Sequence, residues 1–136
     1  MKQTRILLID DDPFFMRQHI DYLKAEEFDV LHITSVESAL QAAESGAEAF
    51  DVVILDIMMP PGKYGKESTE GGIRTGIRLL EELRKLLPVI PIIVLTFTPE
   101  FYNVQERIES KVTVCLRKPI LPSELVSWIR TSTKGL

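Results

Sequence analysis

Polar residues that can do chemistry follow four of the apolar runs in this sequence. They are Asp10, Asp11 and Asp12 after the run at 6–9, Asp56 after 52–55, Thr96 after 92–95, and Lys118 after 112–116. Carboxylates that lie close together raise one another's pKa unless a cation intervenes. Hard oxygen ligands of this kind favour Mg²⁺, which proteins hold through one or two carboxylates, water and phosphate oxygens.

A carboxylate in such a setting can also act as a nucleophile. Its attack on a phosphoryl donor would form an acyl phosphate. A metal ion and Lys118 would neutralise charge on the transferring phosphoryl group, and the Thr96 hydroxyl could donate a hydrogen bond to one of its oxygens. If the fold brings these residues together, their types therefore predict phosphoryl transfer to an aspartate.

The apolar runs that precede these residues have the length and composition of buried parallel strands. Continuous stretches of Val, Ile and Leu stand at 6–9, 52–55 and 92–95, with weaker ones at 30–33 and 112–116. Between the runs, apolar residues recur at helical spacing. This spacing predicts helices around 16–23, 36–43 (with Ser35 as its N-cap), 73–87, 101–108 and 121–129. Strict alternation of strands and helices predicts an α/β fold with a parallel sheet covered on both faces. Ligands bind beyond the carboxyl ends of such strands, where the polar residues would meet.

Length and composition are those expected of a single domain over residues 1–136. The net charge is −4, from 16 basic and 20 acidic residues, so we expect no direct nucleic-acid binding. No apolar stretch approaches the roughly 20 residues of a membrane helix, and the first residues do not resemble a signal peptide. We therefore expect a cytoplasmic protein without membrane association. The single cysteine, Cys115, fits a reducing compartment and is expected to lie in the core.

Four motifs together resemble the receiver domain of two-component response regulators. The motifs are ILLIDDDP at 6–13, VVILDIMMP at 52–60, IVLT at 93–96 and RKP at 117–119. The resemblance covers essentially the whole chain. It implies a flavodoxin-like (βα)5 fold, a doubly wound parallel sheet of five strands in the order 2-1-3-4-5.

The resemblance also implies a role for each residue of the site. Asp56 would accept a phosphoryl group from the phosphohistidine of a sensor histidine kinase, as part of a phosphorelay. Asp11 and Asp56 would bind Mg²⁺ together with the backbone carbonyl of Met58, and Asp10 would act mainly through water. Thr96 and Lys118 would contact the phosphoryl group, and the bond from Lys118 to Pro119 is often cis in the family. Asp12 matches a position that is commonly acidic but is not a usual ligand.

Three features of the sequence depart from the pattern of the family. Phe97 stands where a small residue normally follows the threonine, so we expect it to overhang the site and slow the hydrolysis of the acyl phosphate. Cys115 replaces an aromatic residue that normally relays phosphorylation to the surface. The polar, Gly-rich loop at about 60–75 is unusually long, although its last residues could extend the helix that follows. We expect this loop to shape the choice of kinase or partner.

The sequence leaves two other functions open. Phe97 and Cys115 are compatible with a pseudo-receiver, an interaction module that keeps the fold without switching by phosphorylation. An aspartyl-phosphate phosphatase would place Asp-x-Asp after the first strand, a spacing that residues 10–12 satisfy, but the motifs around Asp56 and Lys118 fit a receiver better. We therefore expect a signalling domain with at most slow self-dephosphorylation, not an enzyme. His19 and His32 are expected to be structural.

The expected partners are a sensor histidine kinase and a downstream effector or output domain. Family members often pair through the face formed by the fourth helix, the fifth strand and the fifth helix. Phe101, Tyr102 and Trp128 make this face the one where we expect any homodimer to form.

Overall fold

The computed structural model describes residues 3–46, 48–59 and 73–134, and within this part the chain forms one parallel sheet. The strand order is β2-β1-β3-β4-β5, and every neighbouring pair is parallel. The predicted 2-1-3-4-5 order is therefore confirmed. The strands are β1 (Arg5–Ile9), β2 (Asp29–Ile33), β3 (Val52–Leu55), β4 (Ile92–Thr96) and β5 (Val114–Arg117).

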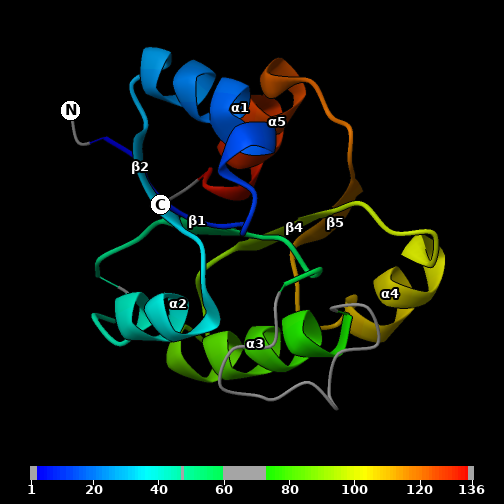
Figure 1. The fold of residues 1–136 in the computed structure, drawn as a ribbon. Coiled ribbons are helices and arrows are strands. Elements are labelled where there is room, and N and C mark those ends of the chain that lie inside the picture. The colour runs from blue at the N-terminus through cyan, green and yellow to red at the C-terminus, as the bar shows by residue number, and fades with distance from the viewer. Residues whose placement is uncertain (1–2, 47, 60–72, 135–136) are drawn as a thin grey trace.

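Helices cover both faces of the sheet, as Figure 1 shows. They are α1 (Pro13–Ala25), α2 (Val36–Ala43), α3 (Ile73–Leu86), α4 (Phe101–Ile108) and α5 (Pro122–Ser132). Helices α1 and α5 lie on one face, and α2, α3 and α4 lie on the other. None of these helices is long and apolar enough to cross a membrane.

The alternation of side chains along each strand divides the core into two clusters. In β1, Leu7 and Ile9 pack with the helices α2, α3 and α4, whereas Ile6 and Leu8 pack with α1 and α5. All four side chains are almost completely buried. This two-sided burial explains why the strand reads as a continuous apolar run and not as an alternating one.

Local signals in the sequence explain where the first two helices begin. The Asp12 carboxylate accepts hydrogen bonds from the backbone N–H of Phe14 and Phe15, and Pro13 occupies the first turn of α1. Ser35 caps α2 as predicted, since its hydroxyl accepts a hydrogen bond from Ser38 N at 3.2 Å. Asp12 therefore has a structural role that its place in the acidic run did not indicate.

The fifth strand differs from its expected boundaries at both ends. The sequence predicts a strand from 112 to 116, but β5 runs from Val114 to Arg117. Val112 lies outside the strand, and Thr113 N donates a hydrogen bond to Ile92 O at 2.8 Å just before pairing with β4 begins. This shift brings the end of β5 to the residue before Lys118.

The connection between β3 and α3 carries most of the predicted long loop. Residues 60–72 lie outside the described part of the chain, and α3 begins at Ile73, so the end of the loop does extend the helix. Gly76 lies in the first turns of α3, where a Cβ atom would collide with the backbone carbonyl of Ile57. A glycine is required there because α3 passes directly against the residue that follows Asp56.

Candidate functional site

Strand register brings the predicted site residues to one edge of the sheet. Ile9 of β1 is the register partner of Leu55 in β3, so Asp10 and Asp56 each follow directly after paired residues. Thr96 of β4 pairs with Arg117 of β5, which puts Lys118 one residue beyond. Parallel pairing thus aligns residues that are up to 108 positions apart in the chain.

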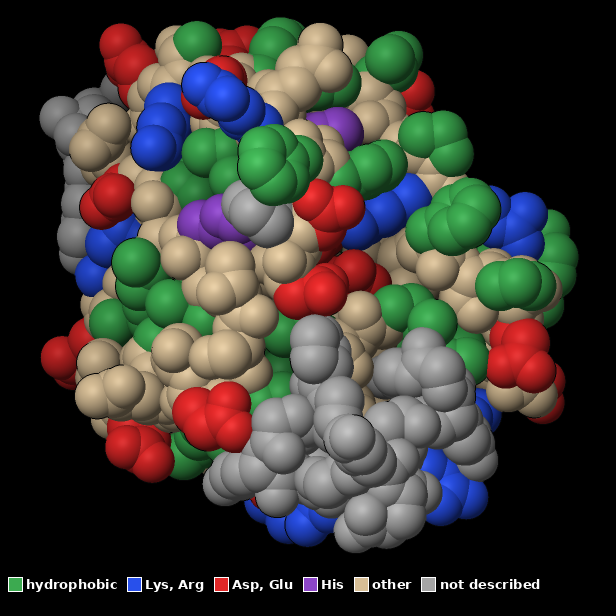
Figure 2. All heavy atoms as spheres, in the orientation of Figure 1, with side chains coloured by type: hydrophobic (Ala, Val, Ile, Leu, Met, Phe, Trp, Pro, Cys, Tyr) green, Lys and Arg blue, Asp and Glu red, His purple; other side chains and the backbone are tan. Residues whose placement is uncertain are grey.

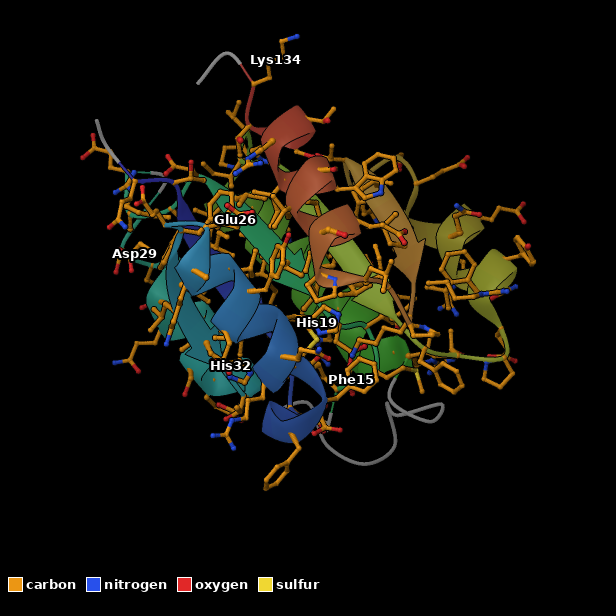
Figure 3. The ribbon with its side chains drawn as sticks, turned by 90° about the horizontal axis from the view of Figure 1, so that it is seen from above. Phe15, His19, Glu26, Asp29, His32 and Lys134 are labelled. Atoms are coloured by element: carbon orange, nitrogen blue, oxygen red, sulfur yellow. The ribbon has the colours of Figure 1, made fainter. Side chains whose placement is uncertain are left out.

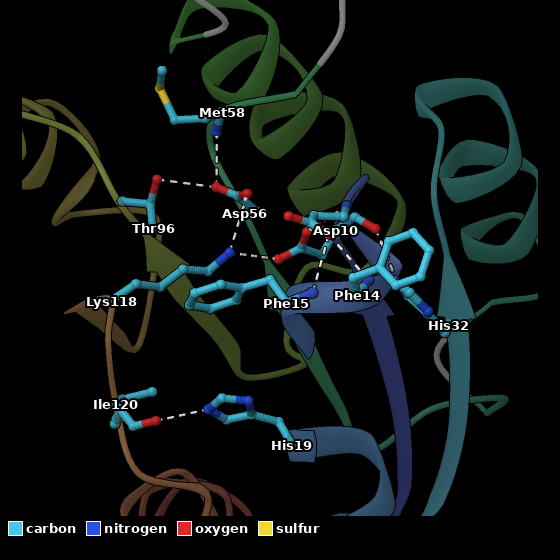
Figure 4. Close-up of polar contacts among 11 residues, drawn as sticks. Asp10, Phe14, Phe15, His19, His32, Asp56, Met58, Thr96, Lys118 and Ile120 are labelled. Carbon is cyan, nitrogen blue, oxygen red and sulfur yellow. Dashed lines mark hydrogen bonds and ion pairs between the residues drawn. The ribbon is translucent and has the colours of Figure 1, made fainter. Parts of the chain in front are cut away.

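Lys118 links the two carboxylates of this edge. Its Nζ atom lies 2.6 Å from Asp10 Oδ2 and 3.4 Å from Asp56 Oδ2 (Figure 4). The three side chains are buried, with 5%, 2% and 7% of Lys118, Asp10 and Asp56 exposed. The peptide bond between Lys118 and Pro119 is cis, as the resemblance implied. Buried charges in proteins are stable only when they are paired, and this lysine pairs with both acids.

The two oxygen atoms of Asp56 have different surroundings. Oδ1 accepts hydrogen bonds from Thr96 Oγ1 and from Met58 N, each at 3.0 Å. Oδ2 faces the Lys118 ammonium. The Asp56 backbone is held by a hydrogen bond from its N–H to Ile9 O at 2.9 Å. Three contacts thus orient the carboxylate, and the backbone bond fixes the residue that carries it.

Asp10 is held in the same way, by side chain and backbone. Its Oδ1 accepts a hydrogen bond from Asp12 N at 2.8 Å, and its backbone carbonyl accepts one from His32 Nε2 at 2.9 Å. His32 belongs to β2, so this bond connects Asp10 to the strand that neighbours β1. The structural role expected of His32 is thus observed.

The acids of the site carry more negative charge than Lys118 can balance. Asp10, Asp11 and Asp56 each place a carboxylate oxygen within 4.8 Å of the others. Burial raises the pKa of Asp56, and the neighbouring Lys118 partly opposes this shift. Burial and the charge of Asp10 raise the pKa of Asp11. Figure 2 shows the acidic side chains gathered near the middle of one face of the molecule.

This donor set fits a hard divalent cation. Three carboxylates against one ammonium leave an excess of negative charge, and the ligands are all oxygen. Asp11 is exposed, so the site is open on one side, as Mg²⁺ requires if it is to keep water ligands. The backbone N–H of Met58 points to Asp56, while metal binding by its carbonyl stays a prediction.

An aromatic ring from α1 completes the surroundings of Lys118, and the sequence did not indicate it. The Phe15 ring centroid lies 4.6 Å from Lys118 Nζ. Phe97, which the sequence predicts to overhang the site, is 69% exposed on the connection after β4. A signal that would have found Phe15 is its place three residues after Asp12, on the first turn of the helix that Asp12 caps.

Cys115 of β5 is buried, and burial raises its thiol pKa to about 11, so the thiol stays protonated as expected of a core residue.

The other side of the end of β5 has aromatic contacts of its own. Arg117 lies over the rings of Phe101 and Tyr102, 4.6 and 5.0 Å from their centroids. Phe101 is only 7% exposed, so it belongs to the core and contributes little to the surface where pairing was expected. Tyr102 and Trp128 remain exposed there.

Comparisons with known proteins agree with this geometry. A family model for the response regulator receiver domain matches residues 6–130. The transcriptional regulatory protein CpxR homolog of Haemophilus influenzae is 30% identical over 127 residues, which are 93% of this chain and 49% of the relative. The DNA-binding response regulator MtrA of Mycolicibacterium smegmatis is 32% identical over 128 residues, 94% of this chain and 50% of the relative. The chain thus spans about half the length of these curated relatives.

Solved structures show the same fold. The receiver domain protein (CheY-like) of Methanospirillum hungatei JF-1 superposes with a TM-score of 0.78 at 24% identity, over 97% of this chain and 94% of that protein.

Proposed function

The chain belongs to the response regulator receiver domain family, and on that premise we propose that Asp56 accepts a phosphoryl group from a sensor histidine kinase. The observation that carries the proposal is the position of Asp56 at the end of β3, between the Thr96 hydroxyl and the Lys118 ammonium. Asp10 and Asp11 lie beside it. A phosphoryl group on a carboxylate so placed would have a hydroxyl and an ammonium donor beside it.

Phosphoryl transfer would proceed by attack of an Asp56 carboxylate oxygen on the phosphorus of a phosphohistidine. The O–P bond forms as the P–N bond breaks, and the imidazole leaves with the electron pair and takes up a proton. Lys118 would follow the new negative charge from its position 3.4 Å from Asp56 Oδ2. The Thr96 hydroxyl, which now donates to Asp56 Oδ1, would donate to a phosphoryl oxygen instead.

Mg²⁺ is the cofactor that the donor set favours, and it would be held by Asp11, Asp56 and the Met58 carbonyl, with Asp10 acting mainly through water. When bound, it would neutralise charge on the phosphoryl oxygens. The protein's own residues orient the carboxylates. His32 donates a hydrogen bond to the Asp10 backbone carbonyl, and Met58 N donates one to the Asp56 carboxylate.

The acyl phosphate would act as a switch of a protein-interaction surface and would not be turned over rapidly. Phe97 is the residue proposed to slow hydrolysis, because its large exposed ring follows Thr96 where the family has a small side chain. Phe97→Ala should then speed the loss of phosphate several-fold. Equal hydrolysis rates in the two proteins would show that Phe97 does not slow the loss of phosphate.

The output of the switch belongs to a partner or to an attached domain. Two relatives are named as a transcriptional regulator and a DNA-binding regulator, and this chain matches about half of each. We propose that an effector of this kind responds to the chain, while the chain itself, with a net charge of −4, makes no direct contact with nucleic acid. A homodimer would use the exposed Tyr102 and Trp128.

The deciding experiment is phosphotransfer profiling with purified histidine kinases and radiolabelled ATP. We expect one kinase to label the wild-type chain quickly and Asp56→Asn not at all. Asp29→Asn is the matched control, since Asp29 is an exposed aspartate at the start of β2, away from the carboxyl ends of the strands (Figure 3). Labelling of Asp56→Asn at the wild-type rate would exclude Asp56 as the acceptor.

One observation favours the second candidate, a pseudo-receiver. Cys115 removes the aromatic side chain that the resemblance implies for the relay, and its buried thiol cannot replace one. If the chain is a pseudo-receiver, a phospho-mimic such as beryllofluoride would leave the amide NMR signals of α4 and β5 unchanged. If the chain is a phosphoryl-accepting switch, those signals move in the wild type, and the Asp56→Asn variant shows no response.

A further inference from the structure

The ring of Phe15 occupies the side of the Lys118 ammonium that the two carboxylates leave uncovered. Lys118 Nζ donates to Asp10 Oδ2 and Asp56 Oδ2, and the Phe15 centroid lies 4.6 Å from the same nitrogen. In Figure 4 the ring lies next to the end of the lysine side chain. Lys118 is 5% exposed although Phe15 is 42% exposed, so the ring stands between the charge and the solvent.

The ring is held in this place from two directions. The backbone N–H of Phe15 donates to the capping carboxylate of Asp12 at 3.0 Å, which fixes the first turn of α1. The ring also stacks on His19, one turn later, with centroids 6.1 Å apart and planes 13° from parallel. Figure 3 shows both side chains on the same side of α1.

His19 in turn is tied to the segment that carries the lysine. It is 7% exposed, and its Nε2 donates to Ile120 O at 2.7 Å. Ile120 follows Lys118 by two residues. The Phe15–His19 stack is therefore attached to the loop that carries Lys118. This attachment fixes the position of α1 relative to that loop.

An aromatic ring is chemically different from an aliphatic side chain in this position. The face of the ring carries partial negative charge, so it attracts an ammonium, and the attraction grows when water is excluded. A leucine would cover the lysine without attracting it. The ring can therefore hold Nζ in place without the pull of a third carboxylate, which would draw the ammonium away from Asp56.

We propose that Phe15 is a positioning residue for phosphoryl transfer, whose ring holds the Lys118 ammonium at the Asp10 and Asp56 carboxylates. The inference rests on the proposed function of Asp56. It assigns to α1 a direct part in preparing the site, through a ring that lies against the Lys118 ammonium.

The test compares Phe15→Leu with Phe15→Tyr, using phosphoramidate as a donor because it has the same type of P–N bond as phosphohistidine. We expect Phe15→Leu to slow the phosphorylation of Asp56 roughly tenfold, and Phe15→Tyr, which keeps the ring, to stay within about twofold of wild type. Phe14→Leu is the control, since Phe14 is the neighbouring phenylalanine of α1 and is 84% exposed. It should react at the wild-type rate.

A second measurement separates positioning from packing. Pentafluorophenylalanine at position 15 keeps the shape of the ring but reverses its charge distribution, and it should slow the reaction as Phe15→Leu does. In NMR spectra, the Lys118 Hε protons should show an upfield ring-current shift in wild type and Phe15→Tyr that is lost in Phe15→Leu. These shifts do not depend on phosphorylation or on any loss of fold stability.

The outcomes distinguish a failure of the proposed function of Asp56 from a failure of the proposed role of Phe15. If wild type takes up no phosphoryl group from phosphoramidate or from any kinase, the proposed function fails, and the inference fails with it. If wild type reacts but Phe15→Leu and the fluorinated protein match it, the inference alone is overturned. Slow reaction of both, with Phe15→Tyr near wild type, supports it.

Discussion

Lys118 and Arg117 are consecutive cations at the end of β5, yet their surroundings differ completely. Lys118 is buried between two carboxylates and lies over Phe15 of α1. Arg117 is exposed and lies over Phe101 and Tyr102 of α4. Successive side chains of a strand point to opposite faces, so the two cations face different helices.

The difference shows how one strand end can serve two tasks. A buried ammonium must keep its partners, because an unpaired charge in the interior is strongly unfavourable. An exposed guanidinium is solvated in any case, so its contacts with aromatic rings can break and re-form at little cost. The Lys118 side therefore suits fixed chemistry, and the Arg117 side suits a surface whose contacts can change.

Removal of the buried cation should have the largest effect. Lys118→Met would leave the Asp10 and Asp56 carboxylates without their ammonium and lower the free energy of unfolding by about 3 kcal/mol. Phosphotransfer should fall by roughly 100-fold or more, as when a charge-stabilising donor is lost. Urea denaturation at pH 7 and kinase labelling measure the two effects.

A matched control for this variant is Lys111→Met. Lys111 forms a half-exposed ion pair with Glu81 at 3.4 Å, and its loss should cost only about 0–1 kcal/mol. Similar losses in the two variants would contradict the distinction between buried and exposed cations.

Stabilisation of the fold by metal should depend on the residues around Lys118 and not on those around Arg117. The carboxylates of Asp10, Asp11 and Asp56 outnumber the ammonium, so Mg²⁺ at 100 times its Kd should raise the free energy of unfolding by about 2.7 kcal/mol. Thermal unfolding with increasing Mg²⁺ measures this. Asp11→Asn should reduce the shift and Arg117→Leu should keep it; the reverse pattern would place the cation elsewhere.

The pH dependence of stability follows from the raised pKa of Asp56. Burial raises the pKa in the folded state above the unfolded value of 3.8, so the folded state binds the proton more tightly. Ionisation of Asp56 therefore destabilises the fold as pH rises from 3.8 through the raised pKa. In metal-free buffer at pH 7, Asp56→Asn should unfold at a higher temperature than wild type.

This advantage of Asp56→Asn should shrink as the pH is lowered and vanish below the unfolded pKa, where the carboxyl is protonated in both states. Asp29→Asn, an exposed substitution, should unfold like wild type throughout. An advantage of Asp56→Asn that persists unchanged at pH 3 would show that the charge of Asp56 is not its cause.

Loss of the exposed cation should have the smallest effect. Arg117→Leu removes the contacts with Phe101 and Tyr102 and should cost about 0.5–1 kcal/mol. Phosphotransfer to Asp56 should stay close to the wild-type rate, while the NMR response of α4 to beryllofluoride should weaken. A loss of phosphotransfer comparable to that of Lys118→Met would mean that both cations serve the chemistry.

Much of the architecture was predictable because it depends on local patterns. Apolar runs of four or five residues separated by helical spacing specify strands and helices, and their alternation leads to a parallel sheet. The convergence of Asp10, Asp56 and Lys118 followed from the rule that parallel strands end at one edge. The start of β5 was misplaced, because Val112 continues the apolar pattern of the strand although it lies outside the β4 pairing.

The aromatic contacts were not predictable in the same way. Phe101 was expected on the surface where pairing would occur, but it lies in the core. Phe15 reaches Lys118 only because α1 packs beside the loop that follows β5. A contact across 103 residues of sequence depends on how two helices and a loop settle against one another, and no local pattern encodes that.

By itself the sequence predicted the fold class, the strand order through its family resemblance, and a site in which Asp56 has acidic, hydroxyl and cationic neighbours. These follow from residue type and position along a strand, which the chain carries locally. Only the tertiary structure decided which oxygen of Asp56 each donor contacts, that the Phe15 ring lies against Lys118, and that His19 bonds the loop after β5. Such choices depend on distances of a few ångströms between elements, and those distances are set by the packing of the whole core.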